Sequence, residues 1–274
     1  MLDWAKENNM AVRGHTLVWY SQTPAWIFYE DFDQSKKLVS REVMLARLDS
    51  YMKQVFSMLE EQGYSDIIYA YDVVNEAIME DGKLRMQMNN WYATIGDDFI
   101  LQAFITANRY APENIALFYN DYNEQFKTQA LVDLVKSLVD EDGNSLIDGI
   151  GFQAHLYTED NLTTYFKTVD ALAELGITVE ITELDVSLGA WQHEKRANEE
   201  TLAEQGRYYY NLINGILERK DSGKLNIDAL TFWGVSDGQS WRKSASPLLY
   251  NSAFMKKPAF YGAAQLKDFA GFTE

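Results

Sequence analysis

Two glutamates, Glu76 and Glu183, each directly follow a short apolar run whose composition is typical of a buried strand. A pair of carboxyl groups flanking one bond can supply a proton donor and a nucleophile or base, which is what glycoside hydrolysis requires. Either glutamate alone could be a solvated loop acid, because the chain has 41 acidic residues. Their shared position at strand ends, among polar neighbours, favours the catalytic interpretation.

The neighbours of the two glutamates make chemical sense in that role. Asn75, next to Glu76, could hydrogen-bond a sugar hydroxyl beside the bond that breaks. His155, at the end of another predicted strand, could bridge Glu183 and Asp185. An imidazole between two carboxylates can hold one of them ionised and oriented, although a lone histidine at a strand end can also be purely structural.

Aromatic content and net charge favour a neutral ligand. Trp233 and Trp241 could form the floor and walls of a sugar slot, or could pack in the core. The chain is 14% aromatic and has a formal net charge of −17, from 24 basic and 41 acidic residues. Such an acidic surface repels phosphate backbones, so no nucleic-acid partner is expected. No run of about 18 apolar residues occurs, so no membrane partner is expected either.

Several other chemistries lack the residues that they need. The sequence has no cysteine and three histidines, which removes thiolate sites and leaves too little for a histidine-rich metal centre. It contains no GxSxG nucleophile elbow, and no predicted strand end carries the lysine of a Schiff-base aldolase. We therefore expect no metal and no cofactor.

Alternating strands and helices must position these residues. Six short runs rich in Val, Ile, Leu or aromatic residues predict parallel strands, at residues 11–19, 67–75, 115–119, 149–155, 178–182 and 229–233. Apolar residues recur at helical spacing between them, and no Pro- or Gly-rich linker interrupts the alternation, which predicts one α/β domain over residues 1–274. An open doubly wound sheet fits the pattern too, but it would normally carry a Gly-rich turn after an early strand, so a barrel is favoured.

Some details of the helices can also be predicted. One helix should begin after Ser40, as its N-cap, with the apolar stripe Met44, Leu48, Tyr51, Val55 and Met58. Three glycines follow apolar stripes and suit helix C-terminal caps, namely Gly143, Gly176 and Gly223. Residues 1–9 contain an acidic residue near their start and lack an apolar segment, so we predict that they form a helix and are not a signal peptide.

Six motifs occur in order along the chain: RGHTLVW (residues 13–19), YDVVNE (71–76), NDYN (120–123), GIGFQAH (149–155), ITELD (181–185) and FWGVSD (232–237). With the closing segment Pro258-Ala259-Phe260, they make the chain resemble the endo-β-1,4-xylanases of glycoside hydrolase family 10 over essentially all 274 residues. One such motif alone would be weak, but six in order are highly specific.

The resemblance implies a retaining endoxylanase on a (β/α)8 barrel, secreted and acting on xylan or xylo-oligosaccharides. Glu76 would be the general acid/base and Glu183 the nucleophile, with carboxyl groups about 5–5.5 Å apart. The residues implied to bind the sugar at the cleavage point or to orient the nucleophile are Asn75, Gln153, His155, Asp185, Trp233 and Trp241. Tyr122 and Asn123 match positions near the aglycone side, and Gln22 and Trp26 lie in a loop bordering the donor side.

The sequence departs from the family pattern in two places. Tyr20 stands where members usually have a histidine that contacts the sugar at the cleavage site. Nothing in residues 1–10 matches the family's first two βα units, which include a Glu-Asn pair and a lysine that hold the donor-side sugars. We therefore expect the chain to begin in the helix before the third barrel strand, to lack two βα units, and to self-associate through exposed barrel edges.

Two alternative functions stay open at this point. The first is a catalytically weak or inactive relative that keeps the cleft and binds xylan or oligosaccharides. The second is a hydrolase of the same mechanism that cleaves cellobiose or aryl glycosides, because the sequence does not rank xylose against glucose. The intact Glu76 and Glu183 favour the xylan-cleaving enzyme, whereas Tyr20 and the unmatched start favour the binding protein.

Overall fold

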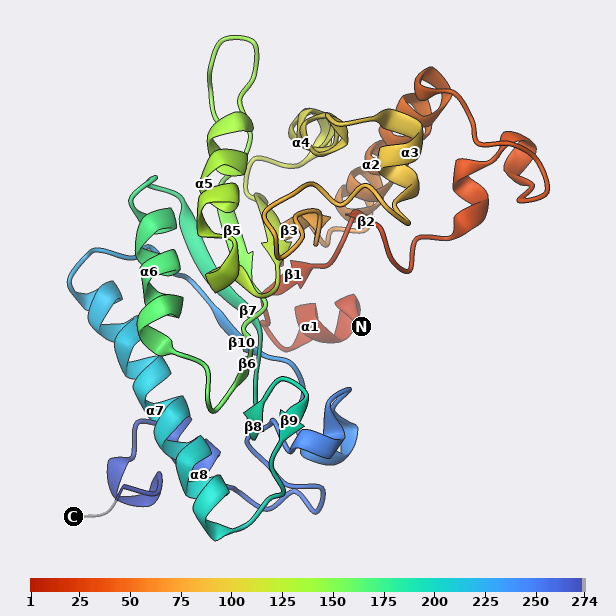
Figure 1. Cartoon of the computed structure of the whole chain (residues 1–274). Coiled ribbons are helices and arrows are strands. Elements are labelled where there is room, and N and C mark those ends of the chain that lie inside the picture. The colour runs from red at the N-terminus through yellow and green to blue at the C-terminus, as the bar shows by residue number, and fades with distance from the viewer. Residues whose placement is uncertain (273–274) are drawn as a thin grey trace. The chain divides into compact units, whose positions relative to one another are not determined.

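The computed structural model describes residues 1–272, which divide into two compact units (Figure 1). The first unit comprises Met1–Asp121 and Gln129–Gly151, and the second comprises Tyr122–Thr128 and the described residues from Phe152 onward. Within residues 1–272, no helix is both long enough and apolar enough to cross a bilayer.

The first unit is built on parallel strands covered by helices. Its strands are β1 (Val12–Gly14), β2 (Val18–Trp19), β3 (Ile68–Asn75), β4 (Ala116–Asp121) and most of β5 (Gly149–Phe152). They follow the order β1-β3-β4-β5, and β2 also pairs with β3. The helices are α1 (Leu2–Glu7), α2 (Arg41–Glu61), α3 (Asn90–Ile95), α4 (Phe99–Tyr110) and most of α5 (Thr128–Ser137), with short 3-10 turns η1 (Ala25–Phe28) and η2 (Glu30–Phe32).

Helix α2 shows where the predicted apolar stripe was right and where it was wrong. The helix follows Ser40 as predicted, and Met44 and Leu48 are fully buried. Further along, the buried residues are Met52, Phe56 and Leu59, whereas Met58 is 44% exposed. Two adjacent apolar columns run along this helix, and spacing alone does not decide which of them faces the core.

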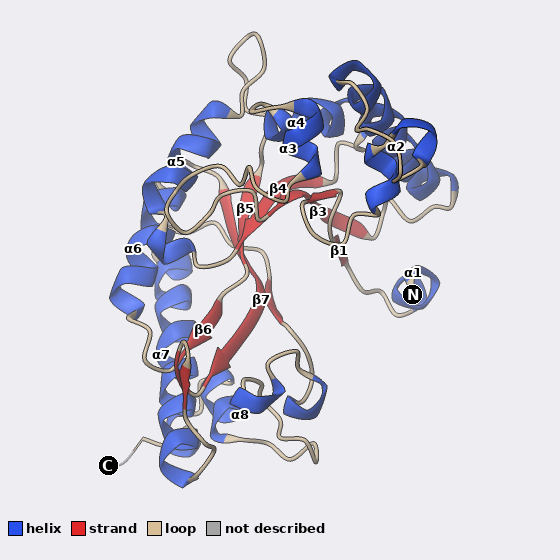
Figure 2. Cartoon of the chain, turned by 45° about the vertical axis from the view of Figure 1, so that its right-hand side comes forward, coloured by secondary structure: helices blue, strands red, loops and turns tan. Residues whose placement is uncertain are grey.

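The second unit is organised around the longest strand of the chain, β7 (Thr178–Ser187). Strands β6 (His155–Tyr157) and β10 (Leu230–Phe232) both pair with it in parallel, and Figure 2 shows β6 beside β7. A hairpin of β8 (Gly189–Ala190) and β9 (His193–Glu194) follows β7 (Figure 1). The helices of this unit are α6 (Leu162–Ala173), α7 (Glu199–Asp221) and α8 (Pro258–Ala263), with 3-10 turns η3 (Glu124–Phe126), η4 (Asp237–Gln239), η5 (Lys243–Ala245) and η6 (Lys267–Phe269).

All six predicted strand segments form strands, but several differ in extent. The segment 11–19, for example, is divided between β1 and β2. Strand β7 continues to Ser187 because β6 pairs with its last three residues, so Glu183 lies inside the strand and not after it. The segment 149–155 is divided between β5 and β6, because Ala154 has a positive φ of 56° that interrupts the extended backbone.

The predicted glycine caps are confirmed at two of three positions. Gly176 and Gly223 have positive φ just past the ends of α6 and α7. Gly143 also has positive φ, but it lies in a turn well beyond the end of α5 and caps no helix.

Candidate active site

The carboxyl group of Glu76 is held by side chains of the first unit. Trp19 Nε1 donates a hydrogen bond to Glu76 Oε2 at 3.1 Å, and Asn75 Nδ2 donates to Oε1 at 3.3 Å. Asn120 Nδ2 in turn donates to Asn75 Oδ1 at 3.0 Å, so a fully buried amide on β4 fixes the orientation of Asn75. Both carboxyl oxygens of Glu76 therefore have defined positions before any substrate binds.

The backbone at Glu76 turns sharply at the end of β3. Glu76 has a φ of 58°, a left-handed conformation that is uncommon for a residue with a side chain and that gathers at functional sites. The two amides that follow, of Ala77 and Ile78, both donate to the buried hydroxyl of Tyr119 at 2.9 Å. That hydroxyl donates in turn to Asp121, and burial, reinforced by the Asp121 charge, raises the pKa of Tyr119 well above its ordinary value. The tyrosine stays neutral and clamps the turn.

Tyr20, the departure from the family pattern, lies in this environment. Its ring stands edge-on to Trp19 with centroids 6.2 Å apart, and the guanidinium of Arg85 lies 4.2 Å from its ring centroid. Arg85 Nε also donates to the carbonyl oxygen of Glu76 at 3.0 Å. Burial raises the pKa of Tyr20, and the Glu76 carboxylate adds to that effect. The phenol is therefore a neutral hydrogen-bond donor close to the carboxyl group of Glu76.

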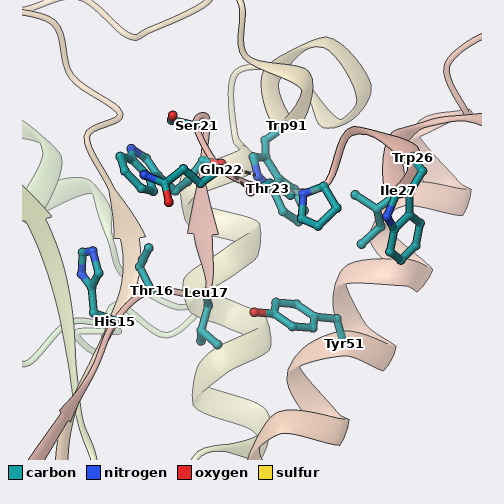
Figure 3. A pocket seen from close by; sticks show the side chains of 12 residues that line it. His15, Thr16, Leu17, Ser21, Gln22, Thr23, Trp26, Ile27, Tyr51 and Trp91 are labelled. Carbon is teal, nitrogen blue, oxygen red and sulfur yellow. Dashed lines mark hydrogen bonds between the residues drawn. The ribbon is translucent and has the colours of Figure 1, made fainter. Parts of the chain in front are cut away.

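A pocket of about 420 Å³ opens beside β2 in the same unit (Figure 3). Gln22 and Trp26, the predicted donor-side residues, both line it, together with Trp19 and the side chains of Tyr51 and Trp91. Gln22 has a φ of 55°, another left-handed position. An aromatic pocket with a few polar groups is suited to a sugar ring.

His15 also lines this pocket, and Asp72 orients its imidazole ring. Its Nδ1 lies 2.9 Å from Asp72 Oδ2, and Arg13 forms a two-point ion pair with the same carboxylate. Asp72 is 1% exposed, and Arg13 stacks over Phe118 at 4.2 Å. A buried, doubly paired carboxylate keeps its position, so the His15 ring has a fixed orientation.

Glu183 occupies the corresponding place in the second unit. His155 Nε2 lies 3.2 Å from Glu183 Oε2, and His155 Nδ1 lies 3.1 Å from Asp185 Oδ1. Glu183 and Asp185 alternate on β7 so that both point to one face, opposite the start of β6. Burial alone would lower the pKa of His155, but Asp185 and Glu183 outweigh it and raise that pKa to about 9. The predicted bridge is present, and its imidazole is a cation at neutral pH.

Two consecutive residues of the loop after β10 complete the environment of Asp185. Trp241 Nε1 donates to Asp185 Oδ2 at 3.0 Å, and Arg242 Nη1 donates to Oδ1 at 2.7 Å. The Trp241 ring packs edge-on against His155 with centroids 5.0 Å apart, yet 66% of its surface is exposed. A tryptophan anchored at its nitrogen and open on its face is a platform for an apolar ligand surface.

Helix α7 holds this loop against the carboxyl end of β7. Gln205 Nε2 donates to the carbonyl oxygens of Val186 and Ser246, both at 2.7 Å. The Tyr209 hydroxyl accepts from Val186 N at 3.2 Å and donates to Pro247 O at 2.7 Å. Both side chains are fully buried, so the loop that carries Trp241 has a fixed register on the strand.

The other predicted site residues follow the ends of β10, β5 and β4. Trp233 directly follows β10, and its amide donates to Leu184 O at 3.1 Å. Gln153 directly follows β5 and is buried. Tyr122 and Asn123 follow β4, with Asn123 in a left-handed conformation and Lys127 Nζ 4.7 Å from the Tyr122 ring.

Sequence reasoning missed Arg242, Tyr119 and Arg85, and it gave no separate role to Trp19. Arg242 and Trp19 each contact a carboxylate 57 residues away along the chain, so no local pattern connects them. The position of Arg242 directly after Trp241, in a polar loop, was the one available signal.

Comparisons with known proteins agree with this arrangement. The chain matches a family model described as glycosyl hydrolase family 10 over residues 1–266. It is 36% identical to a putative endo-1,4-beta-xylanase of Caldicellulosiruptor saccharolyticus, over 96% of this chain and 86% of that protein. It is also 36% identical to endo-1,4-beta-xylanase B of Butyrivibrio fibrisolvens, over 95% of this chain but only 40% of that protein.

A solved structure supports the same relationship. It is an intracellular xylanase of Thermoanaerobacterium saccharolyticum, a mutant in complex with xylotetraose. The match has a TM-score of 0.85 at 36% identity and covers 96% of this chain and 78% of that one. The predicted α/β fold of (β/α)8-barrel type is confirmed by this likeness.

Proposed function

The chain belongs to glycosyl hydrolase family 10, and we propose that it is a retaining endo-1,4-β-xylanase that hydrolyses internal linkages of xylan by double displacement. The observation that carries this proposal is the bridge of His155 between Glu183 and Asp185. A buried cation within ion-pair distance fixes the direction in which a carboxyl nucleophile points.

Glu183 is the proposed nucleophile. Its carboxylate attacks the anomeric carbon of the sugar, and a covalent glycosyl-enzyme forms as the leaving chain departs. His155 orients Glu183 through Nε2, and Asp185, held by Arg242 and Trp241, raises the pKa of the imidazole. Asp185 is therefore a positioning residue that acts through His155.

Glu76 is the proposed general acid/base. It protonates the leaving oxygen in the first step and removes a proton from water in the second. Trp19 and Asn75 fix its two carboxyl oxygens, and the Tyr119 clamp fixes the backbone behind them. The same carboxyl group donates a proton in the first step and accepts one in the second. A carboxyl group that keeps its position through both steps therefore favours turnover.

The substrate is proposed to be a neutral β-1,4-linked xylan chain. The net charge of −17 disfavours anionic polymers, and the open face of Trp241 suits the flat face of a sugar. Gln22, Trp26, Trp233, Gln153, Tyr122 and Asn123 are proposed as further sugar-contacting residues.

Reducing-sugar release from xylan tests the proposal. Wild-type protein should release sugar and Glu183→Ala should not, whereas Glu174→Gln, an exposed glutamate at the end of α6, should match the wild type. Proton NMR of the first product should show the β-anomer. Sugar release by Glu183→Ala at the wild-type rate, or an α-configured first product, would contradict the assignment.

A second candidate function is a binding protein with little catalysis, which the position of Tyr20 favours. The tyrosine ring is stacked under Arg85 close to Glu76, in place of the usual imidazole. In that case xylan would retard the wild-type protein in affinity electrophoresis while no sugar is released. Sugar release at a rate abolished by Glu183→Ala would exclude this alternative.

Three further expectations concern the whole protein. We propose that residues 1–274 act as one catalytic domain, that the full protein is secreted, and that it self-associates through its strand edges. In the described part of the chain, β1 lies at the end of the strand order and pairs with β3 alone. Light scattering coupled to size exclusion tests association, and cell fractionation tests location.

A further inference from the structure

We propose that Trp191 forms a second sugar-binding platform on the β8–β9 hairpin, beyond the sugars that contact Trp241. The inference rests on the proposed function, because its ligand is a longer stretch of the same xylan chain. Trp191 is 70% exposed, the largest exposed fraction of any tryptophan in residues 1–272. A large apolar side chain left in water at the mouth of a site is characteristic of ligand contact.

The hairpin that carries Trp191 is a rigid support. Trp191 and Gln192 form the two-residue turn between β8 and β9, and Gln192 has the positive φ of 61° that such a tight turn requires. At the base of the hairpin, the carbonyl oxygen of Gly189 accepts a hydrogen bond from Glu159 N at 3.0 Å, and the amide of Gly189 donates to Thr158 Oγ1 at 2.9 Å. The backbone that carries Trp191 is therefore held in place before binding, which lowers the entropic cost of stacking.

An ion pair ties the same hairpin to the rest of the unit. Lys195, directly after β9, places Nζ 3.0 Å from Glu159 and 3.4 Å from Glu204 on α7. Its backbone amide also donates to Leu188 O at 3.0 Å. The hairpin is thus fastened on both of its sides, to the end of β6 and to α7.

A series of ring and guanidinium contacts runs from Trp191 to His155, the partner of Glu183. Trp241 packs on His155, and the Arg242 guanidinium lies 4.3 Å from the Tyr157 ring. The Trp191 ring then stands edge-on to Tyr157 with centroids 6.3 Å apart. His155 and Tyr157 are alternate residues of β6 and therefore point to the same face of the strand. A sugar chain that leaves Trp241 along this face meets Trp191 next.

The charges around the hairpin decide the class of ligand. Glu159, Glu194 and Glu204 outnumber Lys195 and Arg196, and Lys195 is already paired with two of the three glutamates. An anionic polymer would be repelled, whereas an uncharged sugar can stack on the indole without an electrostatic cost. The ligand is therefore a neutral polysaccharide and not a phosphate-bearing or acidic partner.

Truncation of the tryptophan tests the platform on long and short substrates. Trp191→Ala should lower kcat/KM on polymeric xylan about three- to tenfold, the range of one aromatic stacking contact, and leave hydrolysis of an aryl β-xylobioside unchanged. Trp191→Phe should recover most of the loss. Trp4→Ala is the matched control, because Trp4 is 59% exposed on α1 in the other unit, and it should behave as the wild type on both substrates.

A binding measurement separates this inference from the proposed activity. In affinity electrophoresis through xylan, Glu183→Gln should be retarded more strongly than the double variant Glu183→Gln with Trp191→Ala, whether or not the wild type turns over. No loss on polymeric xylan, an equal loss on the short substrate, or equal retardation of the two proteins would overturn the platform. A wild type that cleaves neither substrate would refute only the proposed activity.

Discussion

The proposed mechanism depends on a positive charge on His155, and replacing Asp185 tests that charge directly. In Asp185→Asn, the imidazole loses one of its two carboxylate partners while the shape of the side chain is kept. Arg242 and Trp241 both donate to Asp185, so one of them would face the amide nitrogen of the new side chain and lose its acceptor. The change keeps the volume of the side chain but removes its charge and one acceptor.

The magnitude follows from the environment of the imidazole. Burial alone lowers the pKa of His155, and the two carboxylates raise it from 6.5 to about 9. A rise of that size corresponds to about 3.4 kcal/mol in favour of the cation. Asp185 raises the pKa of His155 more than Glu183 does. Loss of the Asp185 charge should therefore remove at least half of this free energy, which lowers the pKa of His155 by more than about one pH unit.

The same shift fixes the sign of a stability effect. Because the pKa of His155 is higher in the folded than in the unfolded chain, the folded state holds a proton that the unfolded state has released between pH 6.5 and about 9. This contribution is complete below pH 6.5 and is lost as the pH rises through about 9. Relative to His155→Gln, the wild type should therefore lose about 3 kcal/mol of unfolding free energy across that range.

NMR titration of the imidazole C–H signals measures the pKa directly, because the chain has only three histidines. His155→Gln assigns the signal, and Asp228→Asn, at an exposed position of the same unit, is the control that should leave it unchanged. The alkaline limit of kcat/KM should move down with the pKa in Asp185→Asn. A His155 signal that titrates near 6.5 in the wild type, or one that Asp185→Asn does not move, would refute the bridge as a charged unit.

Three further substitutions have defined outcomes. Tyr20→His should raise kcat/KM on xylo-oligosaccharides about ten- to a hundredfold, since a transition-state hydrogen bond contributes about 1–3 kcal/mol; an unchanged or lower value would mean that the tyrosine is already accommodated or does not face the sugar. Arg242→Met removes one buried partner of Asp185 and should lower the free energy of unfolding, measured by urea titration, by about 3–5 kcal/mol. A loss below about 1 kcal/mol would show that the ion pair is dispensable for stability. Gly206→Ala should cost about 1–3 kcal/mol in the same assay, because a Cβ atom there would lie 2.3 Å from the Ala270 carbonyl oxygen; wild-type stability would mean that the contact relaxes freely.

The strands were predictable from the sequence because their composition is local information. Each apolar run that became a strand is short, and two of them are followed directly by a glutamate that is visible in the same window. Glu76 and Glu183 were predicted as catalytic residues on this basis, and the predicted contact of His155 with Glu183 is present. The α/β class followed from the alternation of these runs with helices.

The remaining parts of the site depend on contacts that the sequence does not display. Trp19 and Arg242 reach their carboxylates across 57 residues, and the hydroxyl of Tyr119 meets amides 41 and 42 residues earlier in the chain. The extent of β7 was underestimated for a similar reason, because its last residues are ordered by pairing with β6. Propensity cannot reveal a partner that only the folded chain brings near.

The fastening of the β8–β9 hairpin also bears on how relatives of this protein can diverge. Thr158, Glu159 and Lys195 hold the base of the hairpin, while residues 190–193 make no hydrogen bond to β7 within the described part of the chain. Insertions or replacements at the tip can therefore accumulate without shifting the register of the strand that carries Glu183. Substitutions at this tip can therefore change which polysaccharides relatives bind, while the strand that carries Glu183 keeps its structure.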